Sequence, residues 1–383
     1  MPPLQMIWHF STSLGLAILN RGYKGVFWEI PMNTPFFYII AMNKIKVSIL
    51  STAFILLLVA CHKEQTDYPV QESSRNSTLL QTKGLGDKEP MVAVYIETND
   101  TNPLNAGDYY LQDGTTFYDC VQLFSANIHR KLVNGVYQPS LYFNEKMVNI
   151  FENGGVQNYI QPLQEQGIAV LMCVIGNWQN IGLSTMNDTQ TTQFAQILSF
   201  AVDKYGLDGI CFGDEYAGVN TVVSGSYSNI ILKFRELQPN AIITVFDWGA
   251  TSSISSAAAA EIDYVYHGYY GYYLTHSYSN VTGIMSDRWS PISLTLGNTY
   301  SASTLNTIRL WSSNAYNADY AAIMHFNFRQ SSDVDPLPVM QAHADALDWG
   351  TVYCTNGDRP RSSGYVPGGY TITYSDAIEG LSQ

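Results

Sequence analysis

Residues 205–216 read YGLDGICFGDEY, and this stretch decides how the chain folds. An amphipathic helix runs up to Tyr205, with apolar residues at three- and four-residue spacing. A short apolar strand follows Asp208 and ends on two carboxylates, Asp214 and Glu215. A helix that feeds directly into a buried strand with acids at its carboxyl end is typical of a (β/α)₈ barrel, where the active site gathers at that end.

Side chains alternate between the two faces of a strand. Cys211, Gly213 and Glu215 should therefore share one face, and Asp214 should point to the other. The strand thus delivers a single acid to the face that carries Glu215.

Further alternating elements extend on both sides of this stretch. Apolar strands are expected at residues 91–97, 120–125, 168–175, 209–213, 242–246, 262–266, 292–296 and 321–326. Helices are expected at 157–166, 194–205, 229–237, 304–313 and 339–347. This order predicts an α/β fold, a (β/α)₈ TIM barrel in a single domain. A doubly wound open sheet is the alternative, but it normally carries a glycine-rich turn after its first strand, where this chain has Glu97-Thr98-Asn99-Asp100.

Five segments make up the predicted domain organisation. Residues 1–41 are expected to be a mis-assigned upstream extension, 42–61 a lipoprotein signal peptide and 62–89 a flexible tether; 90–350 should form the barrel and 351–383 a C-terminal tail of loop or small hairpin. The apolar run before Cys61 is shorter than the about 18–20 residues of a membrane-spanning helix, which is the alternative for this segment. The motif LVAC at 58–61 resembles a lipobox, so Cys61 is the expected lipidation site.

Lys63 and Glu64 follow the lipobox and resemble the export signal of surface lipoproteins in Bacteroides-type bacteria. We therefore expect an outer-membrane, cell-surface protein that meets the membrane only through a lipid. Within the folded part, Asn134-Gly135 between apolar flanks predicts a hairpin near the mouth of the barrel.

Composition narrows the classes of partner. The net charge is −13, without a run of basic residues longer than two, which disfavours nucleic acid and anionic membrane. The 27 Tyr and 7 Trp residues provide flat amphipathic surfaces that suit sugars. Cys120, Cys173 and Cys211 lie in apolar runs and are expected to be buried thiols. No spacing of Cys or His residues typical of metal ligands is present, so neither a metal nor a cofactor is expected. We also expect the protein to be a monomer.

Polar and aromatic residues at or just past the strand ends are the candidate sugar contacts, because functional residues of a barrel gather there. They are Glu97, Asn127, Asn177, Trp178, Asp214, Asp247, Trp248 and Asn327. Trp178 and Trp248 are the best candidates for stacking against a sugar ring.

The YGLDG and DEYA segments at 205–209 and 214–217 resemble the motif of family 18 glycoside hydrolases, in the branch of endo-β-N-acetylglucosaminidases. Further similar segments are YIETN (95–99), FSANI (124–128), YFNE (142–145), QPLQEQG (161–167), GN (176–177) and YYG (269–271). The resemblance covers about residues 90–350. It implies a barrel enzyme that cuts between the two core N-acetylglucosamines of N-linked glycans, using the substrate's own acetamide as the nucleophile in place of a second protein carboxylate.

The resemblance assigns Glu215 as the acid and Tyr269 as a hydrogen-bond partner of the acetamide oxygen. It also exposes departures from the family pattern. Gly213 stands where an acetamide-orienting Asp belongs, Cys211 stands where that Asp's supporting carboxylate belongs, and His267 replaces an amide side chain. His267 is either a titrating replacement base or a wall residue with its hydrogen bonds satisfied.

Two functions remain open at this stage. The first is a surface protein that binds glycans containing N-acetylglucosamine, with weak or absent hydrolysis. The second is an active endo-β-N-acetylglucosaminidase that uses Glu215 as acid. The missing carboxylate favours the first, because removing one preorganised transition-state partner costs roughly 2.7–4 kcal/mol.

Overall fold

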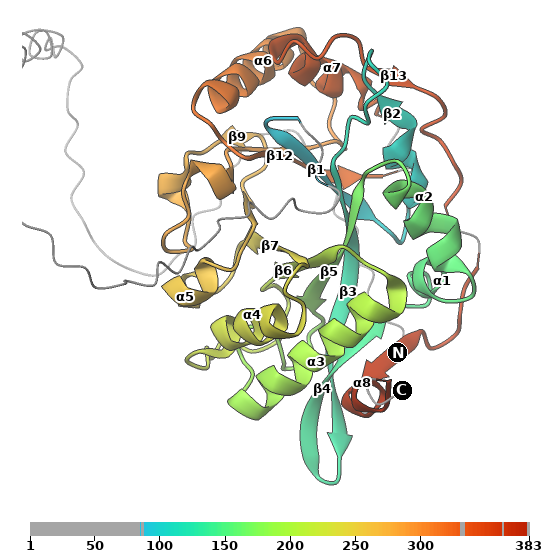
Figure 1. Ribbon diagram of the computed structural model, residues 1–383, viewed down its shortest axis with the longest axis vertical. Helices are drawn as coiled ribbons and strands as arrows, with labels where there is room; N and C mark the ends of the chain where they lie inside the picture. The colour runs from blue at the N-terminus through green and yellow to red at the C-terminus, as the bar shows by residue number, and fades with distance from the viewer. Residues whose placement is uncertain (1–84, 86–87, 330–333, 362–363, 381–383) are drawn as a thin grey trace, which may run out of the picture. The chain divides into compact units, whose positions relative to one another are not determined.

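The computed structural model describes residues 85, 88–329, 334–361 and 364–380 (Figure 1). The segments predicted at 1–41 and 42–61, with Cys61, lie outside the described residues, as does most of the predicted tether. Among the described residues, none of the helices has the length and apolarity needed to cross a membrane.

A ring of parallel strands forms the centre of the domain. Along the sheet, β8, β7, β6, β5, β3, β1 and β12 follow one another, and each neighbouring pair is parallel. Their bounds are β1 (Met91–Glu97), β3 (Cys120–Val133), β5 (Ala169–Gly176), β6 (Gly209–Gly213), β7 (Ile242–Asp247), β8 (Tyr264–His267) and β12 (Ala322–Phe328).

Pro291 divides the strand that closes this ring. Before it, β10 (Trp289–Ser290) pairs with β8; after it, β11 (Ile292–Thr295) pairs with β12. Proline has no N–H to donate to a ladder, so the strand is interrupted where it changes partner. Because the two halves join both ends of the sheet, the sheet is a closed barrel, which confirms the predicted TIM barrel over the open sheet.

Helices follow most of the strands (Figure 1). They are α1 (Val148–Phe151), α2 (Gln161–Gln164), α3 (Asp188–Tyr205), α4 (Ser226–Leu237), α5 (Ser256–Ala259), α6 (Ala302–Asn317) and α7 (Leu337–Ala346). The helix predicted at 157–166 is instead a π-helical turn, η2 (Val156–Ile160), followed by α2, which has Pro162 in its first turn. The connection from β1 to β3 holds a 3₁₀ helix, η1 (Pro103–Asp108), and the short strand β2 (Tyr109–Tyr110).

Shorter elements fill the remaining connections. η3 (Thr251–Ser253) precedes α5, and β9 (Tyr272–Tyr273), η4 (His276–Tyr278) and η5 (Ser286–Arg288) lie between β8 and β10. β9 pairs antiparallel with β11, which adds a strand to the outside of the ring.

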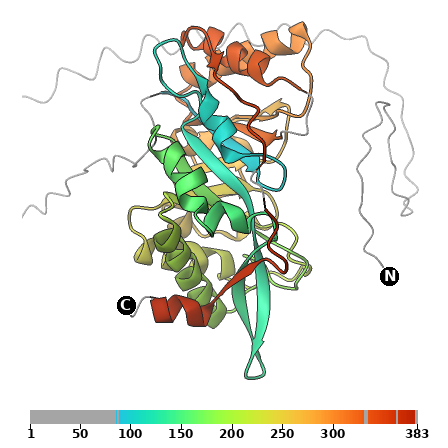
Figure 2. The same cartoon turned by 90° about the vertical axis from the view of Figure 1, so that its right-hand side faces the viewer.

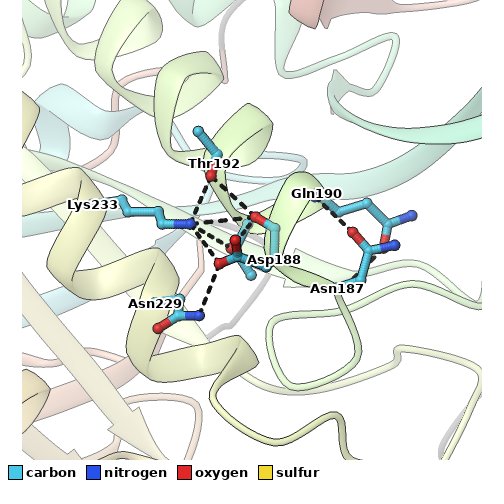
Figure 3. A network of polar contacts seen from close by, with 7 residues as sticks. Asn187, Asp188, Gln190, Thr192, Asn229 and Lys233 are labelled. Atoms are coloured by element: carbon cyan, nitrogen blue, oxygen red, sulfur yellow. Dashed lines mark hydrogen bonds and ion pairs between the residues drawn. The ribbon is translucent and has the colours of Figure 1, made fainter.

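Both ends of α3 are fixed by local sequence. The Asn187 side chain accepts a hydrogen bond from the backbone N–H of Gln190, and the Gln190 side-chain oxygen accepts one from the backbone N–H of Asn187. Gly206 ends the helix in the left-handed conformation. Figure 3 shows how the same end is tied to α4: Lys233 Nζ lies 2.8 Å from Asp188 Oδ1 and 2.6 Å from Thr192 Oγ1. The two helices on either side of β6 are thereby held to each other.

The side chains divide into two apolar cores, one inside the barrel and one between the strands and the outer helices. The inner core contains Tyr95, Cys173, Cys211, Phe246 and Tyr266. The predicted face of α3 lies in the outer core, where Phe194, Ile197, Leu198, Ala201, Val202 and Tyr205 are all buried. Cys120, Cys173 and Cys211 are buried free thiols, as predicted.

The hairpin predicted at Asn134-Gly135 is present, with both residues at positive φ. It joins β3 to β4 (Val136–Phe143) and projects from the barrel in both views (Figures 1 and 2). The C-terminal residues differ from the loop or small hairpin expected for them. β14 (Tyr370–Thr373) pairs with β4, α8 (Tyr374–Gly380) follows it, and β13 (Tyr353–Cys354) pairs with β2. The open edge of the long hairpin, which sequence periodicity did not indicate, supplies the partner for β14.

The cap of α3 gives a first prediction. In Asn187→Ala the backbone N–H of Gln190 loses its acceptor, so the free energy of unfolding should fall by about 1 kcal/mol. Urea denaturation measures this change. Asn187→Asp keeps an acceptor and should stay near the parent; an equal loss in both variants would contradict the capping role.

Candidate active site

A cavity of about 530 Å³ opens at the carboxyl ends of the barrel strands. Its walls are formed by Tyr95, Glu97, Phe124, Cys173, Ile175, Gly213, Glu215, Tyr216, Phe246, Trp248, Gly268, Tyr270, Phe326 and Arg329. Most of these side chains are aromatic or aliphatic, and few are charged. An enclosed apolar site with few converging polar groups is typical of small-molecule and sugar binding.

The carboxyl end of β6 behaves as its alternation predicts. Gly213 and Glu215 line the cavity, and Cys211 lies below them in the inner core. Asp214 points away from the cavity. The expectation that one acid reaches the inner face is therefore confirmed.

Asp214 braces the loops on either side of β6. Its Oδ1 accepts a hydrogen bond from Ser184 N at 3.2 Å, and its Oδ2 accepts one from Ala250 N at 3.0 Å. Ser184 follows β5 and Ala250 follows β7, so one carboxylate ties three neighbouring strand ends together. We correct its assignment from glycan contact to positioning residue, because its oxygens are occupied outside the cavity.

A close backbone contact fixes the main chain at Glu215. Gly176 N donates to Glu215 O at 2.8 Å, and a Cβ on Gly176 would lie 2.6 Å from that oxygen. Trp178 N then donates to Tyr216 O at 2.6 Å, which continues the contact past the end of β5. Only glycine permits the approach, so the β5 side of the mouth is tied to the main chain of the acid.

The environment of Glu215 suits a group that carries a proton near neutrality. Burial, reinforced by the neighbouring charge of Asp214, raises the pKa of Glu215 to about 7. A carboxyl group with a raised pKa can act as a general acid.

The Cys211 thiol fits into the barrel interior. Its Sγ lies 3.1 Å from the hydroxyl of Tyr95, and Cys173 is its neighbour across the β5–β6 ladder. Burial raises the pKa of Tyr95 well above its usual range, so this hydroxyl is neutral. The position next to Gly213 on the inner face is thus occupied by a small thiol side chain.

A second carboxylate, Glu97, lines the cavity at the end of β1. Arg329 Nη2 lies 3.2 Å from Glu97 Oε1, and Arg329 Nε donates to the side chain of Asn327. Burial raises the pKa of Glu97, and the Arg329 guanidinium opposes this shift. Asn327, expected to contact sugar, instead orients the arginine.

Two aromatic pairs flank the mouth. Trp178 is 69% exposed and its ring centre lies 5.7 Å from that of Tyr216; Trp248 is 44% exposed and lies 5.6 Å from Tyr269. Trp248 and Tyr216 also line the cavity. Exposed, paired rings of this kind provide the flat faces on which sugar rings stack.

Comparison with known proteins places this site in a family. No family model matches the chain. The chain is 30% identical over 257 residues to an endo-β-N-acetylglucosaminidase of Flavobacterium sp. (strain SK1022), across 64% of this chain and 77% of that protein. The chain belongs to the endo-β-N-acetylglucosaminidases of glycoside hydrolase family 18. It is also 32% identical over 189 residues to endo-β-N-acetylglucosaminidase F1 of Elizabethkingia meningoseptica, across 46% of this chain but only 55% of that relative.

Solved structures share the fold. EndoBT-3987 of Bacteroides thetaiotamicron, in complex with a Man9GlcNAc2Asn substrate, aligns with a TM-score of 0.60 over 75% of this chain and 73% of that chain. The same protein with a Man5GlcNAc product gives the same score. At 21% identity this likeness shows a common barrel.

In this family 18 barrel, Tyr270 and not Tyr269 forms the cavity wall. Tyr266 lies in the inner core, so the alternation along β8 brings Gly268 and then Tyr270 to the cavity. Tyr270 stacks on Phe326 with ring centres 4.8 Å apart, whereas Tyr269 is 52% exposed at the rim. The catalytic assignment of Tyr269 is therefore corrected: it belongs to the rim pair with Trp248.

His267 is buried in the barrel wall and is not among the residues that line the cavity. It is buried, its Nε2 lies 3.1 Å from the carbonyl oxygen of Pro291, and its ring stacks on Trp289. Burial lowers the pKa of His267, so it is neutral at neutral pH. It faces the seam between β8 and β11 and is not among the residues that line the cavity, so of its two expected roles the structure fits the wall residue with its hydrogen bonds satisfied.

Asp247 also faces away from the cavity. It is buried, and its carboxylate accepts hydrogen bonds from Thr251 Oγ1 at 2.5 Å and from Asn280 N at 2.8 Å. Its expected glycan contact is replaced by a loop-holding role.

Asn177 and Asn127 lie on the hairpin side of the mouth. The Asn177 amide is 2.8 Å from His129 Nε2, and His129 stacks on Tyr142. Asn127 pairs with Ile175 across the sheet and shares its face, although the cavity walls do not include it.

Sequence reasoning missed the aromatic floor of the cavity and its arginine. The missed wall residues are Tyr95, Phe124, Phe246, Tyr270, Phe326 and Arg329. The signal for two of them was present, since Phe246 stands two residues before Trp248 and Tyr95 two before Glu97, on the same faces. Among the described residues, no group of three or more His, Cys, Asp or Glu is placed to hold a metal ion.

The hydrogen bonds that Asp214 accepts from Ser184 N and Ala250 N should contribute to the free energy of unfolding. Asp214→Ala leaves the backbone N–H groups of Ser184 and Ala250 without their acceptor, and should lower the free energy of unfolding by roughly 1.5–3 kcal/mol. Asp214→Asn keeps an oxygen and should lose less. Urea denaturation of both variants checks this, and an unchanged midpoint for Asp214→Ala would contradict it.

Because Glu215 is buried with a raised pKa, replacing it should increase the stability of the folded protein by an amount that depends on pH. The folded chain holds this proton up to about pH 7, whereas the unfolded chain releases it near 4.5, so native stability falls as pH rises through this interval. Glu215→Gln removes that loss and should be more stable than the parent by roughly 1–3 kcal/mol at pH 8, with no gain at pH 4.5. Denaturation curves at both pH values measure it; the same difference at both would refute a raised pKa.

Proposed function

We propose that this chain binds N-linked or other oligosaccharides containing N-acetylglucosamine in the cavity at the barrel mouth, and that it hydrolyses them weakly or not at all. Its family consists of endo-β-N-acetylglucosaminidases, and EndoBT-3987, which shares the fold, has been captured with a Man9GlcNAc2Asn substrate. The aromatic walls and the two rim pairs supply the binding surface.

The proposal of weak or absent hydrolysis rests on the glycine at position 213. It lies on the cavity face two residues before Glu215, where the family pattern has the Asp that orients the acetamide. Without that side chain the positive charge that develops on the acetamide loses its nearest partner. Removing one such preorganised group typically lowers the rate by about 10²- to 10³-fold.

Binding is separable from this defect. The groups that contact a sugar outside the scissile bond are Trp178, Tyr216, Trp248 and Tyr269 at the rim, and all four are present. Interactions made equally with the ground state and the transition state support affinity without supporting rate. The proposed binding surface therefore consists of residues other than those at positions 211 and 213.

An active endo-β-N-acetylglucosaminidase is the second candidate. The observation in its favour is Glu215, whose pKa is raised to about 7 and whose side chain lines the cavity. This acid is suited to protonating the leaving oxygen. In that case the acetamide is oriented by a group other than residue 213.

We also propose that the protein acts at the cell surface as a lipoprotein anchored through Cys61, and that it acts as a monomer. The support is the lipobox at 58–61 and the charged residues after it. Labelling with a palmitate analogue in the native host tests this: label should be present on the parent and absent from Cys61→Ala.

Restoring the family carboxylates separates the two functions. A Cβ at Gly213 would lie 3.0 Å from Ile175 Cγ2, so Gly213→Asp needs a shift of only a few tenths of an ångström. At position 211 a carboxylate would meet the hydroxyl of Tyr95. The double variant Gly213→Asp, Cys211→Asp should release glycan from denatured high-mannose and complex glycoproteins at least 100-fold faster than the parent, as mass spectrometry of the released sugars reports.

The control is the same double variant with Glu215→Gln, which should be inactive because the acid is missing. Release by the parent at the rate of the double variant would show that the parent is an active enzyme. Failure of calorimetry to detect glycan binding by the parent would overturn the proposal altogether.

A further inference from the structure

We propose that Glu97, held by Arg329, is the acceptor for the 2-acetamido N–H of the sugar bound in this cavity. The inference rests on the proposed glycan binding and identifies the group that selects for N-acetylglucosamine. It assigns recognition of the acetamide N–H in the bound sugar to β1, because position 213 on the inner face of β6 has no side chain.

Glu97 is positioned as firmly as Glu215. It ends β1, and its carbonyl oxygen accepts hydrogen bonds from both Asp100 N and Thr101 N at 2.9 Å. The next residue, Thr98, donates through N and Oγ1 to Phe124 O. The chain therefore turns sharply after Glu97, and the carboxylate stays at the cavity wall.

The two carboxylates act on one shared space. Among the described residues that line the cavity, Glu97 and Glu215 are the acidic ones. Both exert electrostatic influence on Cys173, Tyr216 and Tyr270, which raises the pKa of each of these groups beyond the effect of burial. Because both side chains line one cavity of about 530 Å³, a sugar ring bound there lies within reach of both acids.

The charges beside the two carboxyl groups differ. Glu215 lies beside a like charge, Asp214, and its pKa of about 7 makes it a proton donor near neutrality. Burial raises the pKa of Glu97, and the guanidinium of Arg329 beside it opposes that rise; in its ionised form this carboxylate only accepts hydrogen bonds. An acetamide presents both an N–H and a carbonyl, and Glu97, paired with Arg329 at the cavity wall, is the acceptor that the cavity offers to the N–H.

A purely structural ion pair does not account for this placement. Arg329 is 43% exposed, and a partly exposed pair contributes little to stability. Glu97 is only 13% exposed and lies among Phe124, Phe326 and Tyr270, where burying a carboxylate is costly. A ligand N–H that reaches this oxygen explains why a carboxylate is kept in an aromatic cavity.

Calorimetry with the full chain and two disaccharides tests the inference. N,N′-diacetylchitobiose and cellobiose differ in having acetamido or hydroxyl groups at C2. The parent should bind the acetylated sugar more tightly. Glu97→Ala should weaken that binding by about 10- to 100-fold and leave cellobiose affinity nearly unchanged, since a charge-assisted hydrogen bond is lost.

Two further variants are measured in the same way: Arg329→Met tests the ion pair, and Glu165→Ala is the control. Without the guanidinium, Glu97 should protonate at higher pH, so the Arg329→Met variant should lose affinity for diacetylchitobiose on acidification before the parent does. Glu165 is an exposed carboxylate at the end of α2, and its removal should change nothing. Circular dichroism should give the same spectrum for every variant.

The outcomes are distinct. Binding of diacetylchitobiose by the parent with an undiminished preference in Glu97→Ala overturns the role of Glu97 and leaves the proposed function standing. No binding of either sugar by the parent overturns both. Equal weakening for the two sugars in Glu97→Ala shows a structural effect and also overturns the assignment.

Discussion

The two hydrogen bonds that Asp214 accepts from Ser184 and Ala250 hold the mouth of the barrel together. They fix three consecutive strand ends, and because side chains alternate along β6 they also force Glu215 inward. The adjacent contact between Gly176 N and Glu215 O fixes the main chain at the same point. The position of the acid is thus a property of the fold, independent of whether the neighbouring catalytic groups are kept.

For this reason the inner face of β6 can hold Glu215 in a fixed position although positions 211 and 213 lack the carboxylates of the family pattern. Cys211 and Tyr95 pack against each other, so the interior stays filled without the carboxylate that the family pattern places there. Gly213 leaves the cavity wall open, but the aromatic rings around it contact one another and need no carboxylate for support. The packing of the barrel interior and of the cavity wall therefore does not depend on carboxylates at positions 211 and 213, and the aromatic pairs at the rim are formed by separate residues.

Periodicity predicted the strands of the barrel, the face of α3 and the inward direction of Glu215. It failed where alternation was not carried past the end of a strand: Asp247 and His267 point outward, while Phe246 and Tyr270 form the cavity wall. The ion pair between Glu97 and Arg329 joins the first and last strands of the barrel, so no local pattern indicated it. The pairing of β14 likewise depends on an edge made by a distant hairpin.

The order of pairing has a consequence for synthesis of the chain. β1 needs β12 as a neighbour, β4 needs β14, and Asp108 receives the guanidinium of Arg359 at 2.7 Å. Each of these contacts joins an early segment to a late one, so the ring closes only after nearly the whole chain has left the ribosome. Until then the first strand has a free edge on one side, where other chains can pair.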